Sequence, residues 1–291
     1  MNEENLLTLG IIGNTSKDEV SKLLTEIVDY LVEMKISFLV DESIGNVTSV
    51  KMRKYSANQG KILSEANCIL SLGGDGTFLN TARIVGNRNI PILGVNLGRL
   101  GFFSEVSPKE IKKFIPDLLL HKFRITEQVI IKCITNGKVI YGLNDIVVDK
   151  SDSIRMIETE TFYNGEKVVK CVSDGMIVST PAGSTGYSLS CNGPIVNPDS
   201  SVFIITPISP HTLNVRPIIV PDNGEIKIKV HKESNARITA DGQKAVKINT
   251  PSEIILEKAD YTIKVIKKLD TTYFNTLKQK LFWGEDKRHS K

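Results

Sequence analysis

The chain has 291 residues, a formal net charge of +4 at pH 7, and 24% charged and 41% hydrophobic residues. This length suits one large domain or two of ordinary size. The composition is that of a soluble globular protein, which excludes a disordered or collagen-like chain. Its basic residues form no long block, so the sequence does not indicate a nucleic acid partner.

The sequence also gives no sign of a membrane partner. No apolar stretch approaches the roughly 18 to 20 residues that span a bilayer, and the first residues, Met1-Asn2-Glu3-Glu4, carry negative charge where a signal peptide is positively charged. We therefore expect a cytoplasmic protein. The four cysteines form no Cys-x-x-Cys pair and the four histidines are scattered, which argues against a disulfide scaffold and against a zinc site.

Strands and helices alternate over the first part of the chain. Short apolar runs that predict buried strands lie at residues 6–12, 36–40, 68–72 and 90–95. Apolar residues at helical spacing predict one helix after the first strand and others at residues 78–85 and 108–120. Such alternation predicts an α/β domain with a mostly parallel sheet, which we place at residues 1–122.

Beyond residue 122 the hydrophobic period changes to that of strands. Strand-like runs lie at residues 129–135, 138–143, 154–163, 167–172, 226–230, 253–257 and 261–266. Turns that accept positive φ, and so predict hairpins, are Asn136-Gly137, Asn164-Gly165 and Asp241-Gly242. We expect a β-rich domain over residues 123–268. The C-terminal segment 269–291 should pack back on the first domain, with a short helix at 271–282.

The sharpest local motif is Gly73-Gly74-Asp75-Gly76-Thr77, between a strand-like run and a helical pattern. Open α/β sheets bind ligands at this end of a strand. The glycines let main-chain N–H groups face a phosphate. An acidic side chain would repel that phosphate unless it binds a metal or accepts a proton, so Asp75 is a candidate for chemistry. The alternative is that Asp75 only caps the helix.

Two further polar clusters stand out in the β-rich part. The stretch from Asp174 to Ser190 contains a hydroxyl-rich loop at 181–186 followed by Tyr187, which offers hydrogen-bond donors and a flat face for a base. An N-cap with a core tyrosine would fit the stretch equally well. Asn144-Asp145 interrupts an apolar run and is either a bulge or a ligand-binding pair, because each unpaired buried group would cost roughly 1 to 3 kcal/mol.

The chain resembles the bacterial-type ATP-NAD kinases from residue 6 to about residue 266. The motifs that carry the resemblance are, in order, Gly73-Gly74-Asp75-Gly76-Thr77, Gly94-Val95-Asn96-Leu97-Gly98 with Leu100-Gly101-Phe102, Asn144-Asp145, Asp174 through Ser190, Pro210-His211-Thr212-Leu213 with Arg216-Pro217, and Asp241-Gly242-Gln243. Diacylglycerol and sphingosine kinases share the first motif, and phosphofructokinases share it more loosely. The full set of motifs in this order is far more specific for the ATP-NAD kinases than the first motif alone.

The resemblance implies an enzyme that transfers the terminal phosphate of ATP to the 2′-hydroxyl of the adenosine ribose of NAD, giving NADP. It implies a divalent cation, with Mg²⁺ expected, and NAD and ATP as ligands of a site between the two domains. It also implies a homodimer or homotetramer.

The same resemblance assigns roles to individual residues. Asp75 becomes the proton acceptor and a candidate metal ligand, with Gly76 in the nucleotide site. Asn144 and Asp145 contact the ribose hydroxyls or the base of NAD. The other residues expected around this ligand are Arg155, Asp174, Thr185, Gly186, Tyr187, Ser188, Leu189, Ser190 and Gln243, and further candidates for the site are Gly74, Thr77 and His211.

Departures from the family pattern fall in the ligand-binding motifs. Ala182 and Gly186 stand where members commonly have Thr and Ala, and Asp145 stands where many have Glu. We expect these changes to alter affinity rather than to abolish activity.

Two other functions compete with this one. A lipid kinase of the diacylglycerol or sphingosine type would explain residues 73–77 and the two-domain layout. A non-catalytic dinucleotide-binding regulator would explain binding residues without turnover. The polar loop at 181–190 lacks the broad apolar surface that a lipid tail needs, and the presence of Asp75 argues against a regulator.

Overall fold

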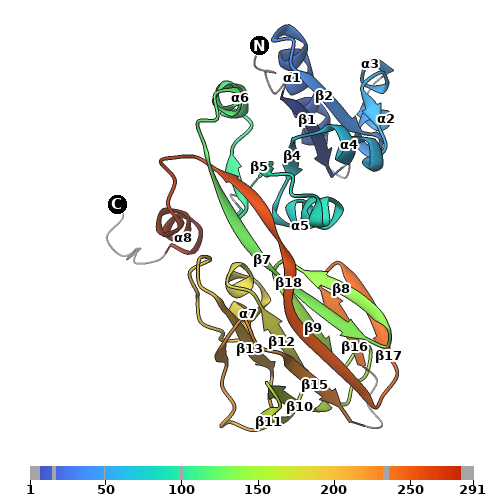
Figure 1. The fold of residues 1–291 in the computed structure, drawn as a ribbon, viewed down its shortest axis with the longest axis vertical. Helices are drawn as coiled ribbons and strands as arrows, with labels where there is room; N and C mark the ends of the chain where they lie inside the picture. The colour runs from blue at the N-terminus through green and yellow to red at the C-terminus, as the bar shows by residue number, and fades with distance from the viewer. Residues whose placement is uncertain (1–6, 15–17, 49, 99–100, 232–235, 283–291) are drawn as a thin grey trace. The chain divides into compact units, whose positions relative to one another are not determined.

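The computed structural model describes residues 7–14, 18–48, 50–98, 101–231 and 236–282 (Figure 1). The chain forms two compact units: the first comprises Met1–Glu127 with Ile263–Lys291, and the second is Gln128–Thr262. The chain passes from one unit to the other within β7 (Arg124–Thr135) and within β18 (Ser252–Lys267). The domain limits expected from the sequence, at residues 122 and 268, stay predictions.

A parallel sheet forms the centre of the first unit. Its strands follow the order β3-β2-β1-β4-β5, and both β6 and the end of β18 pair with β5. The bounds are β1 (Thr8–Gly13), β2 (Ser37–Asp41), β3 (Ser56–Ala57), β4 (Cys68–Gly73), β5 (Ile92–Asn96) and β6 (Ser104–Val106). These pairings are parallel, including Val265 of β18 beside Ile92 of β5, so the predicted parallel sheet is confirmed.

The first unit also contains helices, most of which connect the strands of this sheet, while the last of them follows the last strand, β18. They are α1 (Asp18–Glu33), α2 (Glu42–Thr48), α3 (Val50–Arg53), α4 (Gln59–Glu65), α5 (Asp75–Val85), the 3-10 turn η1 (Gly86–Arg88), α6 (Ile111–Leu119) and α8 (Tyr273–Leu281). The hydrophobic pattern of the sequence does not reveal α2, α3 and α4. In α4 only Ile62 is buried, so a helical period has too few apolar positions to show. None of the described helices is long and apolar enough to cross a membrane.

The second unit is built from antiparallel strands, which confirms the predicted β-rich part. One sheet follows the order β14-β13-β12-β9-β16-β17. In the other, the order is β11-β10-β15-β18, β7 pairs with β18, and β8 pairs with β7. The bounds are β8 (Lys138–Gly142), β9 (Asp145–Asp149), β10 (Ile157–Tyr163), β11 (Glu166–Ser173), β12 (Gly175–Ser179), β13 (Val202–Ile208), β14 (Ile218–Pro221), β15 (Ile226–Val230), β16 (Ala236–Ala240) and β17 (Lys244–Ile248). Met176, Phe203 and Ile228 are buried in its core.

The predicted hairpin turns are confirmed. The φ angles of Asn136, Asn164 and Asp241 are 46°, 49° and 52°, and the glycine that follows each also has positive φ. The strands expected at 253–257 and 261–266 are instead one strand, β18. The charged residues Lys258 and Asp260 interrupt the apolar pattern, and the alternation of burial shifts by one residue at the buried Ala259, but the strand continues through it.

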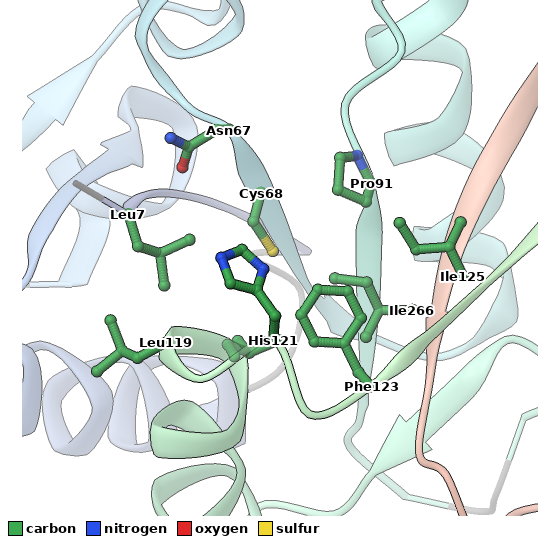
Figure 2. A pocket seen from close by; sticks show the side chains of 10 residues that line it. Leu7, Asn67, Cys68, Pro91, Leu119, His121, Phe123, Ile125 and Ile266 are labelled. Carbon is green, nitrogen blue, oxygen red and sulfur yellow. The ribbon is translucent and has the colours of Figure 1, made fainter. Parts of the chain in front are cut away.

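A cavity of about 340 Å³ lies in the first unit at the amino ends of β1, β4 and β5 (Figure 2). Leu7, Cys68 and Pro91 line it from these strands, and the rings of His121 and Phe123 lie 6.0 Å apart beside them. Ligands of open α/β sheets bind at the carboxyl ends, so this cavity lies at the edge opposite to the expected site. Burial raises the pKa of the Cys68 thiol to about 12, which makes it unreactive.

Candidate active site

The glycine-rich motif forms the direct connection from β4 to α5. Gly74 has extended backbone and is the N-cap residue, and Asp75 is the first residue of the helix. The N–H groups of Thr77 and Phe78 donate to the Gly74 carbonyl at 3.0 and 3.1 Å. A Cβ at Gly73 would lie 2.2 Å from the Thr77 hydroxyl oxygen, so this strand end must be glycine. The N-terminus of α5 therefore lies at the carboxyl edge of the parallel sheet.

The carboxylate of Asp75 is held by residues far away in the sequence. Its Oδ2 accepts a hydrogen bond from the Phe102 N–H (2.9 Å) and its Oδ1 accepts one from the Phe103 N–H (3.2 Å). The Nζ of Lys280 in α8 lies 3.7 Å from Oδ2. The N-cap position belongs to Gly74, so these contacts disfavour the helix-cap alternative. With 32% of its side chain exposed, Asp75 remains accessible to a ligand.

Gly101 allows the backbone to approach Asp75 closely. A Cβ at Gly101 would lie only 1.8 Å from Asp75 Oδ1. The Phe103 ring stacks on Phe78 of α5, with the ring centroids 4.7 Å apart and the planes within 4°. In the sequence, Gly101 and Phe102 appear only within a family motif that does not include Phe103, and the contact of this segment with Asp75 was missed. The signal that could have revealed it is a glycine directly before two aromatic residues.

In the second unit, Asp241 fixes the backbone of the Asn144-Asp145 pair. Its carboxylate accepts hydrogen bonds from the N–H groups of Leu143 (3.0 Å), Asn144 (2.7 Å) and Asp145 (3.2 Å). The N–H of Asp241 donates in return to the Asp145 carbonyl at 3.0 Å. The predicted hairpin turn therefore anchors the polar pair that the sequence marked as unusual.

The hydroxyl-rich loop packs on the same pair. It contains η2 (Ala182–Thr185) and leads into α7 (Tyr187–Ser190). The hydroxyl of Thr180 donates to the Leu143 carbonyl (2.7 Å) and accepts from the Gly183 N–H (3.1 Å). A Cβ at Gly183 would lie 1.9 Å from the Asn144 carbonyl oxygen, so the loop could not approach this closely with a larger residue.

One polar atom of this cluster points to a ligand. Among the described residues, the side-chain oxygen of Asn144 is buried and has no hydrogen-bond partner. Leaving a buried acceptor unpaired costs roughly 1 to 3 kcal/mol, so a donor on a ligand would relieve this cost. The methyl group that Gly186 lacks relative to the family would lie 3.6 Å from Asn144 Nδ2 and 3.8 Å from Asp145 Oδ2. That departure therefore falls beside the same polar pair.

The carboxyl of Asp145 is nearly fully buried. Burial, and secondarily the charge of Asp241, raises its pKa from 3.8 to about 7. A group with this pKa is partly ionised near neutral pH, and it can be drawn to the charged form by a ligand that donates hydrogen bonds to it.

Tyr187 lies within electrostatic range of both Asp145 and Asp174. Strand β12 separates these two carboxyl groups, because Ser179 at one end of β12 pairs with Asp145 and Gly175 at the other end follows Asp174. The side chain of Tyr187 is 46% exposed, which leaves much of its ring available for a ligand. Its pKa is raised by burial first and then by nearby groups that include Cys191 and Asp145. Asp174 forms an ion pair with Lys150, with Asp174 Oδ1 and Lys150 Nζ 2.8 Å apart.

Other candidates have structural partners. The hydroxyls of Ser188 and Thr206 lie 2.9 Å apart and are buried, which supports the packing of α7 on β13. The Thr185 hydroxyl donates to the Ala182 carbonyl at 3.3 Å. Leu189 is half-buried in α7.

The remaining candidates of the second unit are exposed: Arg155, Ser190, His211 and Gln243. The backbone N–H of Arg155 donates to Ser153 Oγ (3.1 Å) and that of His211 to the Val172 carbonyl (2.9 Å). The described contacts do not bring Arg155 or His211 to Asn144. Their roles, like those of the other candidates, stay predictions.

Comparisons with known proteins identify the family. The model of the ATP-NAD kinase N-terminal domain matches residues 9–123, and that of the ATP-NAD kinase C-terminal domain matches residues 143–268. The chain is 35% identical to an NAD kinase of Flavobacterium psychrophilum, over 97% of this chain and 100% of that relative. It is 41% identical to an NAD kinase of Bacteroides fragilis, over 77% of this chain and 79% of the relative.

Solved structures show the same fold. A yeast NADH kinase complexed with NADH superposes with a TM-score of 0.90 at 24% identity, covering 98% of this chain and 90% of the other. An NAD kinase from Archaeoglobus fulgidus in complex with ATP gives a TM-score of 0.73 at 25% identity, covering 95% and 97%.

The fold and the two family models place the chain among the nucleotide-binding kinases. Within that class the chain belongs to the ATP-NAD kinase family. The resemblance seen in the motifs is confirmed, and the lipid-kinase alternative is not favoured.

The raised pKa of Asp145 predicts a pH-dependent effect on stability. Because the folded state binds this proton more tightly than the unfolded chain, the carboxyl lowers stability as the pH rises from 3.8 to about 7. Asp145→Asn should therefore raise the melting temperature more when it is measured at about pH 7 or higher than when it is measured near pH 4. The gain is at most about 4 kcal/mol, since one pKa unit corresponds to about 1.4 kcal/mol. Melting curves at both pH values test this, and an equal effect at both would contradict it.

Proposed function

We propose that the protein transfers the terminal phosphate of ATP to the 2′-hydroxyl of the adenosine ribose of NAD, giving NADP. The observation that carries the proposal is the Asp75 carboxylate, fixed by the Phe102 and Phe103 amides at the start of α5. A secondary alcohol is a poor nucleophile at neutral pH, and a positioned carboxylate takes its proton as the phosphoryl group arrives. The helix N-terminus and the backbone of Gly74 and Gly76 suit the phosphates.

The second unit would bind NAD through the cluster around Asn144. The unpaired Asn144 oxygen can accept a hydrogen bond from a ribose hydroxyl, and so can the carboxylate of Asp145. The half-exposed ring of Tyr187 offers a stacking face for a base. Asp174, Thr185, Ser190 and Gln243 remain candidates for further contacts.

A divalent cation, with Mg²⁺ expected, is part of the proposal. Mg²⁺ usually binds through one or two carboxylates together with substrate phosphates rather than in a cage of protein ligands. The accessible carboxylate of Asp75 suits this mode. When bound, the cation would neutralise charge on the transferred phosphoryl group. The homodimer or homotetramer and the cytoplasmic location stay predictions from the sequence, and light scattering tests the first of them.

A single assay separates the proposed reaction from its alternatives. We expect NADP to form when the protein is incubated with ATP, Mg²⁺ and NAD. We expect no phosphorylated product from sphingosine or diacylglycerol under the same conditions. Phosphorylated lipid without NADP would overturn the proposal in favour of a lipid kinase, and binding of NAD without any turnover would favour a regulator.

Asp75→Asn tests the proton acceptor. We expect kcat to fall by at least the roughly 10² to 10⁴-fold typical of general-base loss, with little change in NAD affinity. The amide keeps only one acceptor for the two N–H groups, so the free energy of unfolding should also fall, by about 1 to 3 kcal/mol. Turnover should therefore be measured well below the melting temperature of the variant. A near-normal kcat would remove Asp75 from the chemical step.

Tyr187→Ala tests the stacking face in the second unit. Loss of the ring should weaken NAD binding by about 1 to 3 kcal/mol, the range known for a base stacked on an aromatic ring. Tyr187→Phe is the matched control, because it keeps the ring and should bind NAD almost normally. Calorimetric titration gives both affinities. Unchanged NAD affinity in Tyr187→Ala, with a lower melting temperature, would make Tyr187 a purely structural residue.

A further inference from the structure

Lys280 of the C-terminal helix α8 reaches the proposed proton acceptor. Its Nζ lies 3.7 Å from Asp75 Oδ2 and 4.9 Å from the centroid of the Phe102 ring. Only 15% of the Lys280 side chain is exposed. The ammonium group is therefore kept beside the carboxylate and the aromatic face, rather than extended into solvent.

Other contacts already fasten this end of the chain to the first unit. Lys267 forms an ion pair with the buried Glu105 at 3.1 Å, and Lys268 forms one with Glu110 at 2.7 Å. The helix itself is capped by Thr272 and buries Leu277. Since these contacts hold the C-terminal segment to the first unit, the Lys280 contact is not needed for that attachment.

The charge of Asp75 presents a difficulty for the reaction. A carboxylate near the transferred phosphate of ATP repels that phosphate, and the repulsion is strong where few water molecules screen it. A cation close to Asp75 reduces the repulsion without removing the proton acceptor. Lys280 supplies such a cation from the protein itself, at the distance stated above.

We propose that Lys280 is a positioning residue for phosphate transfer, which holds the Asp75 carboxylate and offsets its charge when the phosphates of ATP approach. This inference rests on the proposed function. Lys280 acts through Asp75, so its importance should disappear when Asp75 carries no charge.

The experiment compares ATP binding, in the presence of Mg²⁺, across a set of variants of the full chain. Lys280→Met keeps the length of the side chain and the helix propensity, and it should raise the Kd for ATP about tenfold, or about 1.4 kcal/mol. Lys280→Arg should restore most of the affinity. Lys278→Met is the matched control, because Lys278 lies in the same last turn but is exposed, and its ATP binding and turnover should stay normal.

The double variant Asp75→Asn with Lys280→Met decides the mechanism. If Lys280 offsets the charge of Asp75, the double variant should bind ATP more tightly than Lys280→Met alone. Binding as weak as in Lys280→Met would overturn the proposal, because Lys280 would then act independently of Asp75. Unchanged ATP binding in Lys280→Met would overturn it as well.

Kinetics separate this inference from the proposed function. In NADP formation, Lys280→Met should lower kcat and raise the KM for ATP more than the KM for NAD. A purely structural loss would instead lower the melting temperature and leave the ratio of the two KM values unchanged. If the unaltered protein binds ATP but forms no NADP, the proposed function fails. The ATP-binding series then still tests the link between Lys280 and Asp75.

Discussion

In the first unit, the Asp75 carboxylate accepts hydrogen bonds from the N–H groups of Phe102 and Phe103, and the placement of the proposed chemical group depends on this contact. It requires glycine at position 101, because any Cβ there would overlap the carboxylate. The stacked rings of Phe78 and Phe103 hold the same segment against α5. A flexible turn thereby becomes a rigid support for a reactive side chain.

In the second unit, too, a carboxylate accepts hydrogen bonds from backbone N–H groups, but there it fixes the backbone beside the candidate ligand-binding residues. There the Asp241 carboxylate binds the backbone of residues 143–145, and the side chains of Asn144 and Asp145 take no part in these hydrogen bonds. Because the backbone donors are already satisfied, these side chains can serve a ligand without loss of local structure. The buried side-chain oxygen of Asn144 is the atom of this cluster that has no hydrogen-bond partner among the described residues.

The two acidic residues that we assign to the reaction have opposite electrostatic surroundings. Asp75 lies beside the ammonium group of Lys280, with Nζ 3.7 Å from Oδ2. Asp145 is buried beside another carboxylate, which raises its pKa to about 7. The first arrangement suits a proton acceptor next to phosphate, and the second suits a group that becomes fully charged only when hydroxyl donors reach it.

The sequence by itself determined the parallel and antiparallel parts of the fold, the hairpin turns and the turn that carries Asp75. These features follow from local rules, namely hydrophobic period and the need for glycine or asparagine at positive φ. Only the tertiary structure showed that Gly101 and Lys280 lie beside Asp75 and that Asp241 lies beside Asp145, because these residues are far apart in the sequence. It also joined two expected strands into β18, because pairing with β15 on one side of Asp260 and with β5 on the other keeps the chain extended between them.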